Sequence, residues 1–395
     1  MCPYFEDTIK EKSMKVAVLG FGTVGYGVFE MLKNAEGLEP GSVLVRQGKD
    51  DADYKVTSIS QITCDPEIWA VAEVMGGTDP AYEYVSAALR AGKHVVTSNK
   101  ALVAAHGPEL EKLAAENNVA FLFSAACGGA VPFLHNIALA VESDSILSLG
   151  GILNGTTNYM LDAMQSRFMT YADALADAQA LGYAEADPTA DVSGMDALRK
   201  IMLACAVAYN MLPDSGLCCE GIESITAEDV NHIQASGYTC RLVTSGGLSD
   251  DGKLYAYIEP VLFPANAPEC SVLKNFNMAK YIGKNSGQIV FMGQGAGRWP
   301  TASAVLRDLN DILHGKRIMM RPDCKRVTAD NSLCEHRYYV RLPENLCTAL
   351  PTEKADVFDG IARVTTKAIS VKAMHDFAEE SRKGGSSVFF AAIGD

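Results

Sequence analysis

The sequence predicts an α/β protein with a doubly wound parallel sheet, a second α+β domain and a small C-terminal module. Strand-like apolar runs alternate with amphipathic helical runs up to about residue 124. Such alternation requires crossover connections, which produce a parallel sheet. The small residues and proline of AACGGAVPF interrupt this rhythm, and a linker-like stretch, HGKRIMMRPDCKR, precedes a short tail. These breaks divide the chain into residues 1–130, 131–299 and 320–395.

The first domain contains five strand-like runs and three helical ones. The strands are expected at residues 15–20, 42–46, 68–77, 93–99 and 119–124. The helices are expected at 23–34, 80–92 and 101–118. Short, nearly continuous apolar runs are typical of strands that are buried on both faces. We therefore expect helices on both sides of this sheet.

The second domain mixes strands and helices in another way. Strands are expected at 145–155, 253–263 and 287–293, and helices at about 158–168, 171–181 and 194–211. This mixture predicts an α+β domain with a mainly antiparallel sheet. In the tail, HRYYVRL, ISVKAMHDFAEES and SVFFAAIG read as strand, helix and strand, which predicts the C-terminal module.

The composition excludes several classes of function. The formal net charge is −14, whereas nonspecific nucleic-acid binding needs a cationic surface. The chain carries no signal-peptide pattern and no apolar run of membrane-spanning length, so we expect no membrane partner. The 11 cysteines lack CxxC spacing, which favours reduced thiols in a cytoplasmic protein over a zinc or redox site.

A glycine-rich motif, GFGTVG, follows the first strand and opens the first helix. This is the context that the GxGxxG pattern needs for dinucleotide binding. Gly20 permits the tight turn, Gly22 lets the backbone approach a pyrophosphate, and Gly25 lets the helix pack close to the sheet. We therefore expect a Rossmann domain with nucleotide contacts from Gly20, Phe21, Gly22, Thr23, Val24 and Gly25. The alternative is a glycine-rich turn without a ligand.

The end of the second strand indicates which cofactor binds. NAD-selective sites place Asp or Glu there, whereas this chain has Arg46, with Lys49 nearby. A guanidinium suits a 2′-phosphate, so we expect NADP(H), with NAD(H) still open and a solvent-facing Arg46 as the alternative. Lys100, in TSNKALVA, follows a strand that ends at the ligand-binding edge of the sheet. The alternative for Lys100 is an ordinary lysine at a helix start.

Charged residues stand at the beginning of an apolar stretch, GMDALRKIMLACAVAYNM. The residues after Lys200 are apolar on every side of the expected helix. Asp196 and Lys200 are four residues apart and therefore project the same way, while Asp191 and Glu185 lie just upstream. Charges partly removed from water need partners or a ligand. This pattern predicts a catalytic site or, alternatively, a simple ion pair within the helix.

Five segments occur in an order and at separations that resemble homoserine dehydrogenases. They are GFGTVG, TSNKALVA, GGILNGTTNYML, LGYAEADPTADVSGMDALRK and GQGAGRWPTASAVLRDL, and the resemblance covers about residues 14–310. The block at 181–200 is its most specific part. The resemblance implies NAD(P)-dependent interconversion of L-homoserine and L-aspartate 4-semialdehyde by hydride transfer, on the route to threonine, isoleucine and methionine.

The resemblance also implies roles for matching residues. Catalytic roles fall to Lys200, acting at the substrate's C4 oxygen, to Asp196 beside it, and to Lys100 between cofactor and substrate. Substrate contacts are implied for Glu185, Asp191, Gly155 and Thr156. Gly295 would contact the nucleotide, and a helix at about 300–315 would complete the first domain. A homodimer or higher homo-oligomer would form through the sheet of the second domain.

Two features depart from the family pattern. A monovalent-cation site in the family uses a glutamate at the position of Ser124, so the carbonyls of Cys127, Gly129 and Val131 would hold an ion without it. The sequence therefore assigns no metal. The tail resembles a degenerate ACT module: HRYYVRLPEN is similar to its first strand, but the usual proline–glycine turn is missing. A sensor, an oligomerisation element and a lid all stay open for the tail.

Two other functions stay open beside this one. The first is another Rossmann oxidoreductase that acts on a small amino-acid-like aldehyde. Glu185 and Asp191 argue against it, because they call for a cationic substrate. The second is a non-catalytic, metabolite-sensing NAD(P)-binding protein, and the presence of Lys100, Asp196 and Lys200 argues against that reading.

Overall fold

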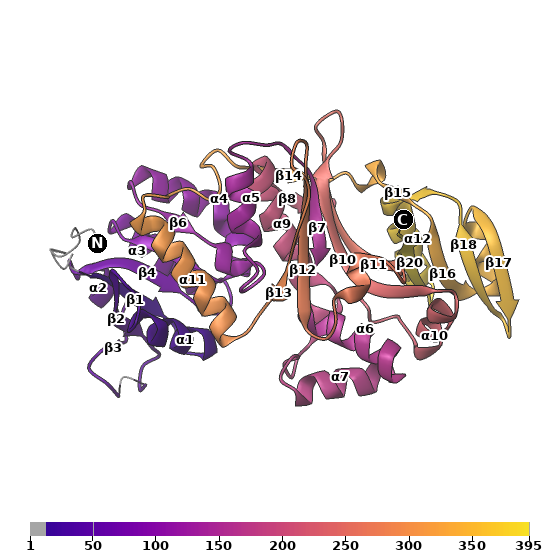
Figure 1. The fold of residues 1–395 in the computed structure, drawn as a ribbon, viewed down its shortest axis with the longest axis horizontal. Coiled ribbons are helices and arrows are strands. Elements are labelled where there is room, and N and C mark those ends of the chain that lie inside the picture. The colour runs from indigo at the N-terminus through magenta and orange to yellow at the C-terminus, as the bar shows by residue number, and fades with distance from the viewer. Residues whose placement is uncertain (1–12, 50, 395) are drawn as a thin grey trace, which may run out of the picture. The chain divides into compact units, whose positions relative to one another are not determined.

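The structure, a computed structural model, describes residues 13–49 and 51–394 and divides into two compact units (Figure 1). The described residues before Phe133, together with Ala296–Asp323, form unit 1. Unit 2 contains Phe133–Gly295 and the described residues from Cys324 onward. The predicted fold class is confirmed, because unit 1 holds a parallel sheet and unit 2 a separate, mainly antiparallel one.

The sheet of unit 1 has six parallel strands in the order β3-β2-β1-β4-β5-β6. They are β1 (Met14–Leu19), β2 (Leu38–Leu44), β3 (Lys55–Val56), β4 (Ile68–Glu73), β5 (His94–Thr97) and β6 (Phe121–Leu122). Strand order reverses between β1 and β4, and ligands of doubly wound sheets bind at the carboxyl edge beside such a reversal. Val16 to Leu19 in the central strand are fully buried, which explains their continuous apolar run.

Helices cover this sheet, and one of them comes from much later in the chain. They are α1 (Thr23–Leu32), α2 (Ser60–Thr63), α3 (Ala81–Arg90), α4 (Lys100–Glu116) and α11 (Arg298–Leu313), with the short 3-10 segment η1 (Ser124–Ala126). Helix α11 lies against α1, where Gly27 faces Arg298 and Ala302 (Figure 1). Unit 1 is thus assembled from two separate parts of the sequence.

The main sheet of unit 2 has ten strands, of which nine follow the order β13-β12-β7-β10-β11-β20-β16-β18-β17 and β9 pairs with β11. The bounds are β7 (Ile146–Ile152), β9 (Cys218–Cys219), β10 (Tyr238–Leu248), β11 (Leu254–Pro264), β12 (Phe276–Gly283), β13 (Gly287–Gln294), β16 (Tyr338–Pro343), β17 (Thr352–Phe358), β18 (Ile361–Thr366) and β20 (Phe389–Ile393). Neighbouring strands are antiparallel except that β20 and β9 run parallel to β11. Two small ladders join β8 (Met211–Ser215) to β14 (Lys325–Thr328) and β15 (Glu335–His336) to β19 (Ile369–Ser370).

Seven helices belong to unit 2. They are α5 (Phe133–Ala140), α6 (Gly155–Arg167), α7 (Tyr171–Ala180), α8 (Thr189–Val192), α9 (Met195–Tyr209), α10 (Ala227–Ala235) and α12 (Val371–Lys383), beside the 3-10 segments η2 (Pro268–Ser271), η3 (Asn331–Leu333) and η4 (Glu344–Ala349). Helix α9 packs on β7, β10 and β11 and against α5, and ten of its 15 residues are buried. The expected buried helix is therefore confirmed.

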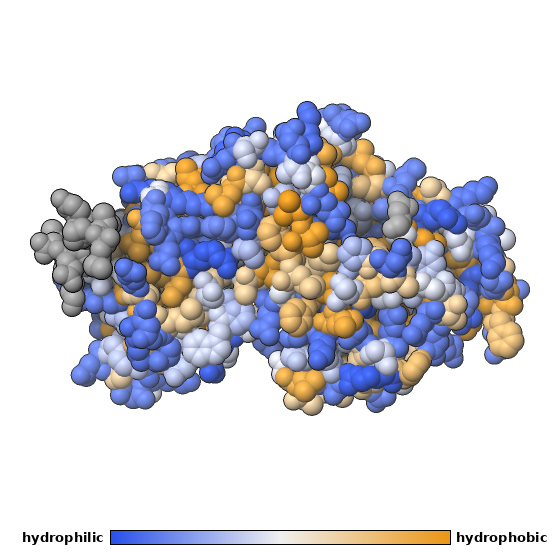
Figure 2. All heavy atoms as spheres, viewed as in Figure 1, coloured by the Kyte–Doolittle hydropathy of each residue, from blue (hydrophilic) through white to orange (hydrophobic). Residues whose placement is uncertain are grey.

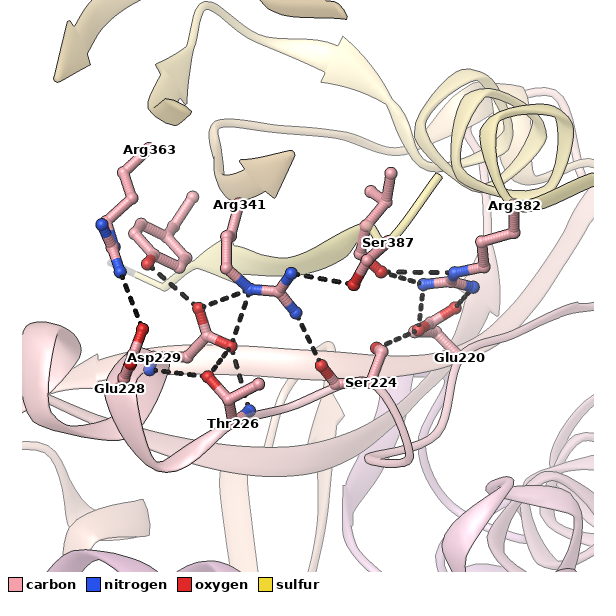
Figure 3. A network of polar contacts seen from close by, with 11 residues as sticks. Glu220, Ser224, Thr226, Glu228, Asp229, Arg341, Arg363, Arg382 and Ser387 are labelled. Carbon is pink, nitrogen blue, oxygen red and sulfur yellow. Dashed lines mark hydrogen bonds and ion pairs between the residues drawn. The ribbon is translucent and has the colours of Figure 1, made fainter. Parts of the chain in front are cut away.

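The C-terminal segment, residues 324–394, contributes four strands to the sheet of unit 2. Its strands β16, β18 and β20 and helix α12 enclose an apolar core that includes Tyr338, Val364 and Met374. Beside this core, Arg341 donates from Nε to both carboxylate oxygens of Asp229 on α10, at 2.9 and 3.0 Å (Figure 3). Both side chains are buried. A buried ion pair therefore joins the C-terminal segment to the rest of unit 2.

No helix in residues 13–49 and 51–394 combines the length and the apolar character needed to cross a bilayer.

Arg341→Met is expected to lower the free energy of unfolding by about 3–5 kcal/mol, because it leaves Asp229 buried without its cation. Denaturant unfolding followed by circular dichroism measures this change. Arg337→Met is the matched control, since it removes an exposed ion pair with Glu353 in the same segment and is expected to cost less than about 1 kcal/mol. Equal, small losses in both variants would contradict a stabilising role for the buried pair.

Candidate active site

The glycine-rich motif forms the strand–turn–helix that dinucleotide binding requires. Gly20 directly follows β1 and has a φ of +96°, and Gly22 is the N-cap of α1. A Cβ atom at Gly25 would lie 2.1 Å from the carbonyl oxygen of Gly20, so only glycine fits this crossing. Thr23 and Val24 open the helix, whose N-terminal N–H groups are suited to a pyrophosphate. The local geometry predicted for residues 20–25 is confirmed.

A buried carboxyl group organises the neighbouring loops at the same edge of the sheet. Glu73, at the end of β4, accepts hydrogen bonds from the Thr97 hydroxyl, from the Met75 backbone N–H at 2.7 Å and from the Asn99 amide at 3.4 Å. Burial raises the pKa of Glu73 to about 7, against the opposing effect of these hydrogen bonds. Asn99 caps α4 by accepting from Leu102, which places Lys100 at the first position of that helix.

Arg46 and Gly295 lie in different units. Arg46 is exposed two residues beyond the end of β2, and its carbonyl accepts from the Lys49 backbone N–H at 3.1 Å. The strand ends at Leu44 instead of the expected residue 46, so Arg46 stands on a turn. Gly295 is buried in unit 2 beside the side-chain amide of Asn277.

The charged residues expected at the start of the buried helix do form one cluster in unit 2. Lys200 Nζ lies 2.7 Å from Asp196 Oδ2 and donates to the Leu153 carbonyl at 2.6 Å. Asn154 Nδ2 donates to Asp191 Oδ1 at 2.7 Å and to Asp196 Oδ2 at 2.9 Å. Asp196 and Lys200 are only 8% and 7% exposed, so these contacts replace lost hydration. The ion pair predicted within α9 is present, and it is part of a larger network.

Local structure explains why these side chains meet. Asn154 is the N-cap of α6, and its Oδ1 accepts from the Thr157 backbone N–H at 2.8 Å. This cap leaves its Nδ2 directed at the two aspartates. Asp196 is in the first turn of α9, where the positive end of the helix dipole favours a carboxylate. One turn later, Lys200 faces the same way.

Thr156 and Asp191 extend the cluster toward the turn after α7. The Thr156 hydroxyl lies 2.6 Å from the Tyr183 carbonyl and 3.2 Å from Asp191 Oδ2. Burial, and then the charge of Asp196, raise the pKa of Asp191 above its ordinary value, while the Asn154 hydrogen bond and Lys200 oppose that shift. The cluster thus holds two carboxylates and one ammonium group, which pairs with Asp196, while Asn154 joins Asp191 to Asp196. An added cation would relieve this imbalance.

Glu185 does not join this cluster in the structure. It is exposed after α7, where its carbonyl accepts from the Gln179 side chain at 3.1 Å. Within the described residues, its carboxylate makes no hydrogen bond or ion pair. Gly155, by contrast, is the first residue of α6 and directly follows Asn154.

The loop that would hold a monovalent cation is organised by a different pair. Ser124 donates to Asp308 from its hydroxyl and from its backbone N–H, the latter at 2.8 Å, and both side chains are buried. Burial raises the pKa of Asp308 to about 6. The Ser124 side chain is therefore hydrogen-bonded to α11. It cannot add a carboxylate ligand to a cation held by the carbonyls of residues 127–131.

For two residues of these networks, the sequence predicts no individual role. Asn154 lies within NGTTNY, directly before Gly-Thr-Thr. Asparagine is a preferred N-cap residue, so its position there indicates the start of a helix. Glu73 ends an apolar strand, where an isolated carboxylate indicates a buried polar role. Each has partners far away in the sequence, which local patterns do not reveal.

Comparisons with known proteins agree with this architecture. A family model described as homoserine dehydrogenase matches residues 132–310, and one described as the NAD binding domain of homoserine dehydrogenase matches residues 20–124. The homoserine dehydrogenase of Pseudomonas aeruginosa is 35% identical over 359 residues, covering 84% of this chain and 82% of that protein. That of Corynebacterium glutamicum is 39% identical over 330 residues, covering 76% and 73%.

Structural similarity extends over nearly the whole chain. The crystal structure of a homoserine dehydrogenase from Thiobacillus denitrificans has a TM-score of 0.85 at 28% identity, covering 97% of this chain and 99% of that one. One from Staphylococcus aureus has a TM-score of 0.74 at 29% identity with the same coverage. These findings confirm the resemblance seen in the sequence motifs. The chain belongs to the homoserine dehydrogenase family of NAD(P)-dependent oxidoreductases.

Proposed function

We propose that the cluster of Asn154, Asp191, Asp196 and Lys200 binds and activates the substrate of the family reaction. The observation that carries this proposal is the hydrogen bonding of one amide, that of Asn154, to two carboxylates, one of which is paired with Lys200. The cluster has more negative than positive charge at a partly desolvated position. This suits an amino-acid substrate, which brings an ammonium group of its own.

The chemistry of Lys200 fits the interconversion of an aldehyde and an alcohol. When bound, the nicotinamide supplies or accepts the hydride. As the aldehyde is reduced, negative charge develops on its oxygen, and the Lys200 ammonium would stabilise that charge and donate the proton. In the reverse direction, the neutral amine would accept the hydroxyl proton. Asp196 would orient Lys200 through the 2.7 Å contact.

Substrate recognition would use the residues around this pair. Asp191 would accept hydrogen bonds from the substrate's ammonium group, as would the exposed Glu185 if the turn after α7 moves toward it. Gly155 and Thr156 begin α6, whose N-terminal N–H groups favour a carboxylate. An amino acid would thus have its ammonium near aspartates and its carboxylate near a helix start.

Cofactor recognition is assigned to unit 1, with a preference for NADP(H) over NAD(H). Residues 20–25 would hold the pyrophosphate. The exposed guanidinium of Arg46, just beyond β2, would bind a 2′-phosphate. Lys100, at the start of α4, would act at the ligand-binding edge of the sheet. For Gly295, which belongs to unit 2, a nucleotide contact is proposed from the motif GQGAG alone.

We also propose that the protein is a homodimer formed through β12 and β13. Phe276, Ile282, Val290 and Met292 are 37–59% exposed, and the strand register directs all four to one face of the sheet. Figure 2 shows apolar surface over this hairpin. Strand β13 is also a sheet edge, which invites pairing or packing with another chain.

Two further proposals concern the domain organisation and the state of the cysteines. Residues 320–395 would be a small module, because its strand order, β20-β16-β18-β17, and helix α12 resemble a βαββαβ unit whose first helix is reduced to η4. The rest of the chain would form two domains. Residues 1–130 together with α11 would bind the nucleotide, and residues 131–299 would bind the substrate. The cysteines are expected to be reduced, as is typical of a cytoplasmic protein, and the buried Cys205 and Cys240 are free thiols.

Lys200→Met is expected to lower turnover about 10²- to 10⁴-fold, because the substrate oxygen loses its charge stabilisation and its proton donor. NADPH oxidation with aspartate semialdehyde, followed by absorbance, measures this effect. NADPH affinity, measured by fluorescence titration, should stay unchanged. Arg199→Met is the matched control, since it removes the adjacent cation of the same helix. Near-normal turnover in Lys200→Met would remove Lys200 from the mechanism.

Arg46→Ala is expected to raise the KM for NADP⁺ about 10- to 100-fold, which corresponds to the loss of a charge-assisted contact to the 2′-phosphate. The KM for NAD⁺ should not change. Steady-state kinetics with both cofactors measure the difference. Arg90→Ala, which removes another exposed arginine of unit 1, should affect neither constant. Equal changes for both cofactors would rule out recognition of the phosphate by Arg46.

Met292→Glu is expected to convert the dimer to monomer, because it buries a carboxylate in an apolar interface. Sedimentation equilibrium measures the mass. Phe358→Glu changes a residue that is 78% exposed at the β17–β18 turn and should leave the mass unchanged. A wild-type monomer, or a dimer that survives Met292→Glu, would contradict this interface.

A further inference from the structure

One segment of unit 2 lies directly against the turn that joins Asp191 to Asp196. We call residues 218–229 the bridging segment. Its Ile222 backbone N–H donates to the Val192 carbonyl at 2.8 Å, and the Cys219 thiol donates to the Ser193 carbonyl at 3.2 Å. A Cβ atom at Gly221 would lie 2.0 Å from the Val192 oxygen. The turn at 192–194 therefore rests on the bridging segment with no room between them.

The opposite side of the bridging segment is held by the C-terminal segment. Glu220 is 7% exposed, and its two carboxylate oxygens accept from Arg382 on α12 at 2.7 and 2.8 Å. Arg382 also donates to the Val388 carbonyl at 2.9 Å, which fixes the guanidinium within its own segment. A paired contact of this kind sets orientation as well as distance. Glu220 is thus held between α12 and the turn at 192–194.

A second arginine continues the same network (Figure 3). Besides its pair with Asp229, Arg341 donates to the Ser224 carbonyl at 2.8 Å and to the Ser387 hydroxyl at 3.0 Å. The Ser224 hydroxyl in turn donates to Glu220 at 3.3 Å. Arg363 Nη2 also lies 3.7 Å from Glu228 Oε2. The bridging segment is therefore contacted by three arginines of the C-terminal segment.

We infer that Arg382 and Glu220 are positioning residues for the substrate cluster, and that the C-terminal segment acts on catalysis through them. The connection runs from α12 to Glu220 and then to the turn between Asp191 and Asp196, through the Cys219 thiol and the backbone of Gly221 and Ile222. A shift of that turn would change the separation of the two carboxylates that Asn154 joins. The inference rests on the proposed role of this cluster in substrate binding.

The expected effect of releasing this contact is specific to the substrate. Arg382→Gln should raise the KM for L-homoserine about 10-fold and lower kcat less, because misplaced binding groups weaken recognition. The KM for NADP⁺ should not change, since residues of unit 1 are untouched. A contact that merely stabilised the fold would instead reduce the active fraction, and so lower kcat with both KM values unchanged.

Milder and matched variants complete the experiment. Arg382→Lys keeps the charge but loses the fork of the guanidinium, so an intermediate rise of about 3-fold is expected even if Arg382→Gln fails to fold. Arg337→Gln removes the exposed pair with Glu353 in the same segment and should leave all constants unchanged.

The outcomes distinguish the inference from the function on which it rests. Normal turnover in Lys200→Met would refute the proposed cluster itself. An inactive Lys200→Met together with a wild-type homoserine KM in Arg382→Lys would refute the positioning role alone. A rise in homoserine KM that follows the order Arg382→Lys, then Arg382→Gln, with the NADP⁺ KM constant, supports both.

Discussion

The site depends on one constraint: two carboxylates and one ammonium group must stay hydrogen-bonded where little water reaches them. Asn154 meets this constraint because its carboxamide has both a donor side and an acceptor side. The oxygen caps α6, and the nitrogen joins Asp191 to Asp196. Loss of either function of the amide would leave buried polar atoms without partners, which is costly. The start of α6 and the geometry of the cluster therefore both depend on the Asn154 side chain.

This requirement links the sheet of unit 2 to the chemistry. Strand β7 ends at Ile152, Leu153 offers its carbonyl to Lys200, and Asn154 begins the cap. Helix α9 packs on the same strand, so its first turn meets the end of β7. An apolar helix buried in the sheet is a rigid base, and its polar first turn projects the reacting groups. The apolar run that follows Lys200 in the sequence thus has a direct functional meaning.

The sequence could predict features that depend on nearby residues. GFGTVG fits within one strand–turn–helix, and Asp196 and Lys200 are separated by one helical turn. The contact between Asn154 and Asp191 spans 37 residues and needed the structure. The sequence does not predict strand β10, because β10 is buried along most of its length and has no alternating pattern. It does not predict β12 either. The insertion of β20 beside β11 was equally hidden, since it joins residues more than a hundred positions apart.

The position of β20 bears on what the C-terminal segment can do. Strand β20 pairs with β11 on one side and with β16 on the other, so the segment is continuous with the sheet that carries β7 and β10. Moving it as a separate body would break the main-chain hydrogen bonds between β20 and β11 and the buried contact of the Tyr338 hydroxyl with Glu259. A hinged lid would need a looser attachment. The arginines that reach the bridging segment therefore stand on a fixed base, which suits a role in holding the substrate cluster in one arrangement.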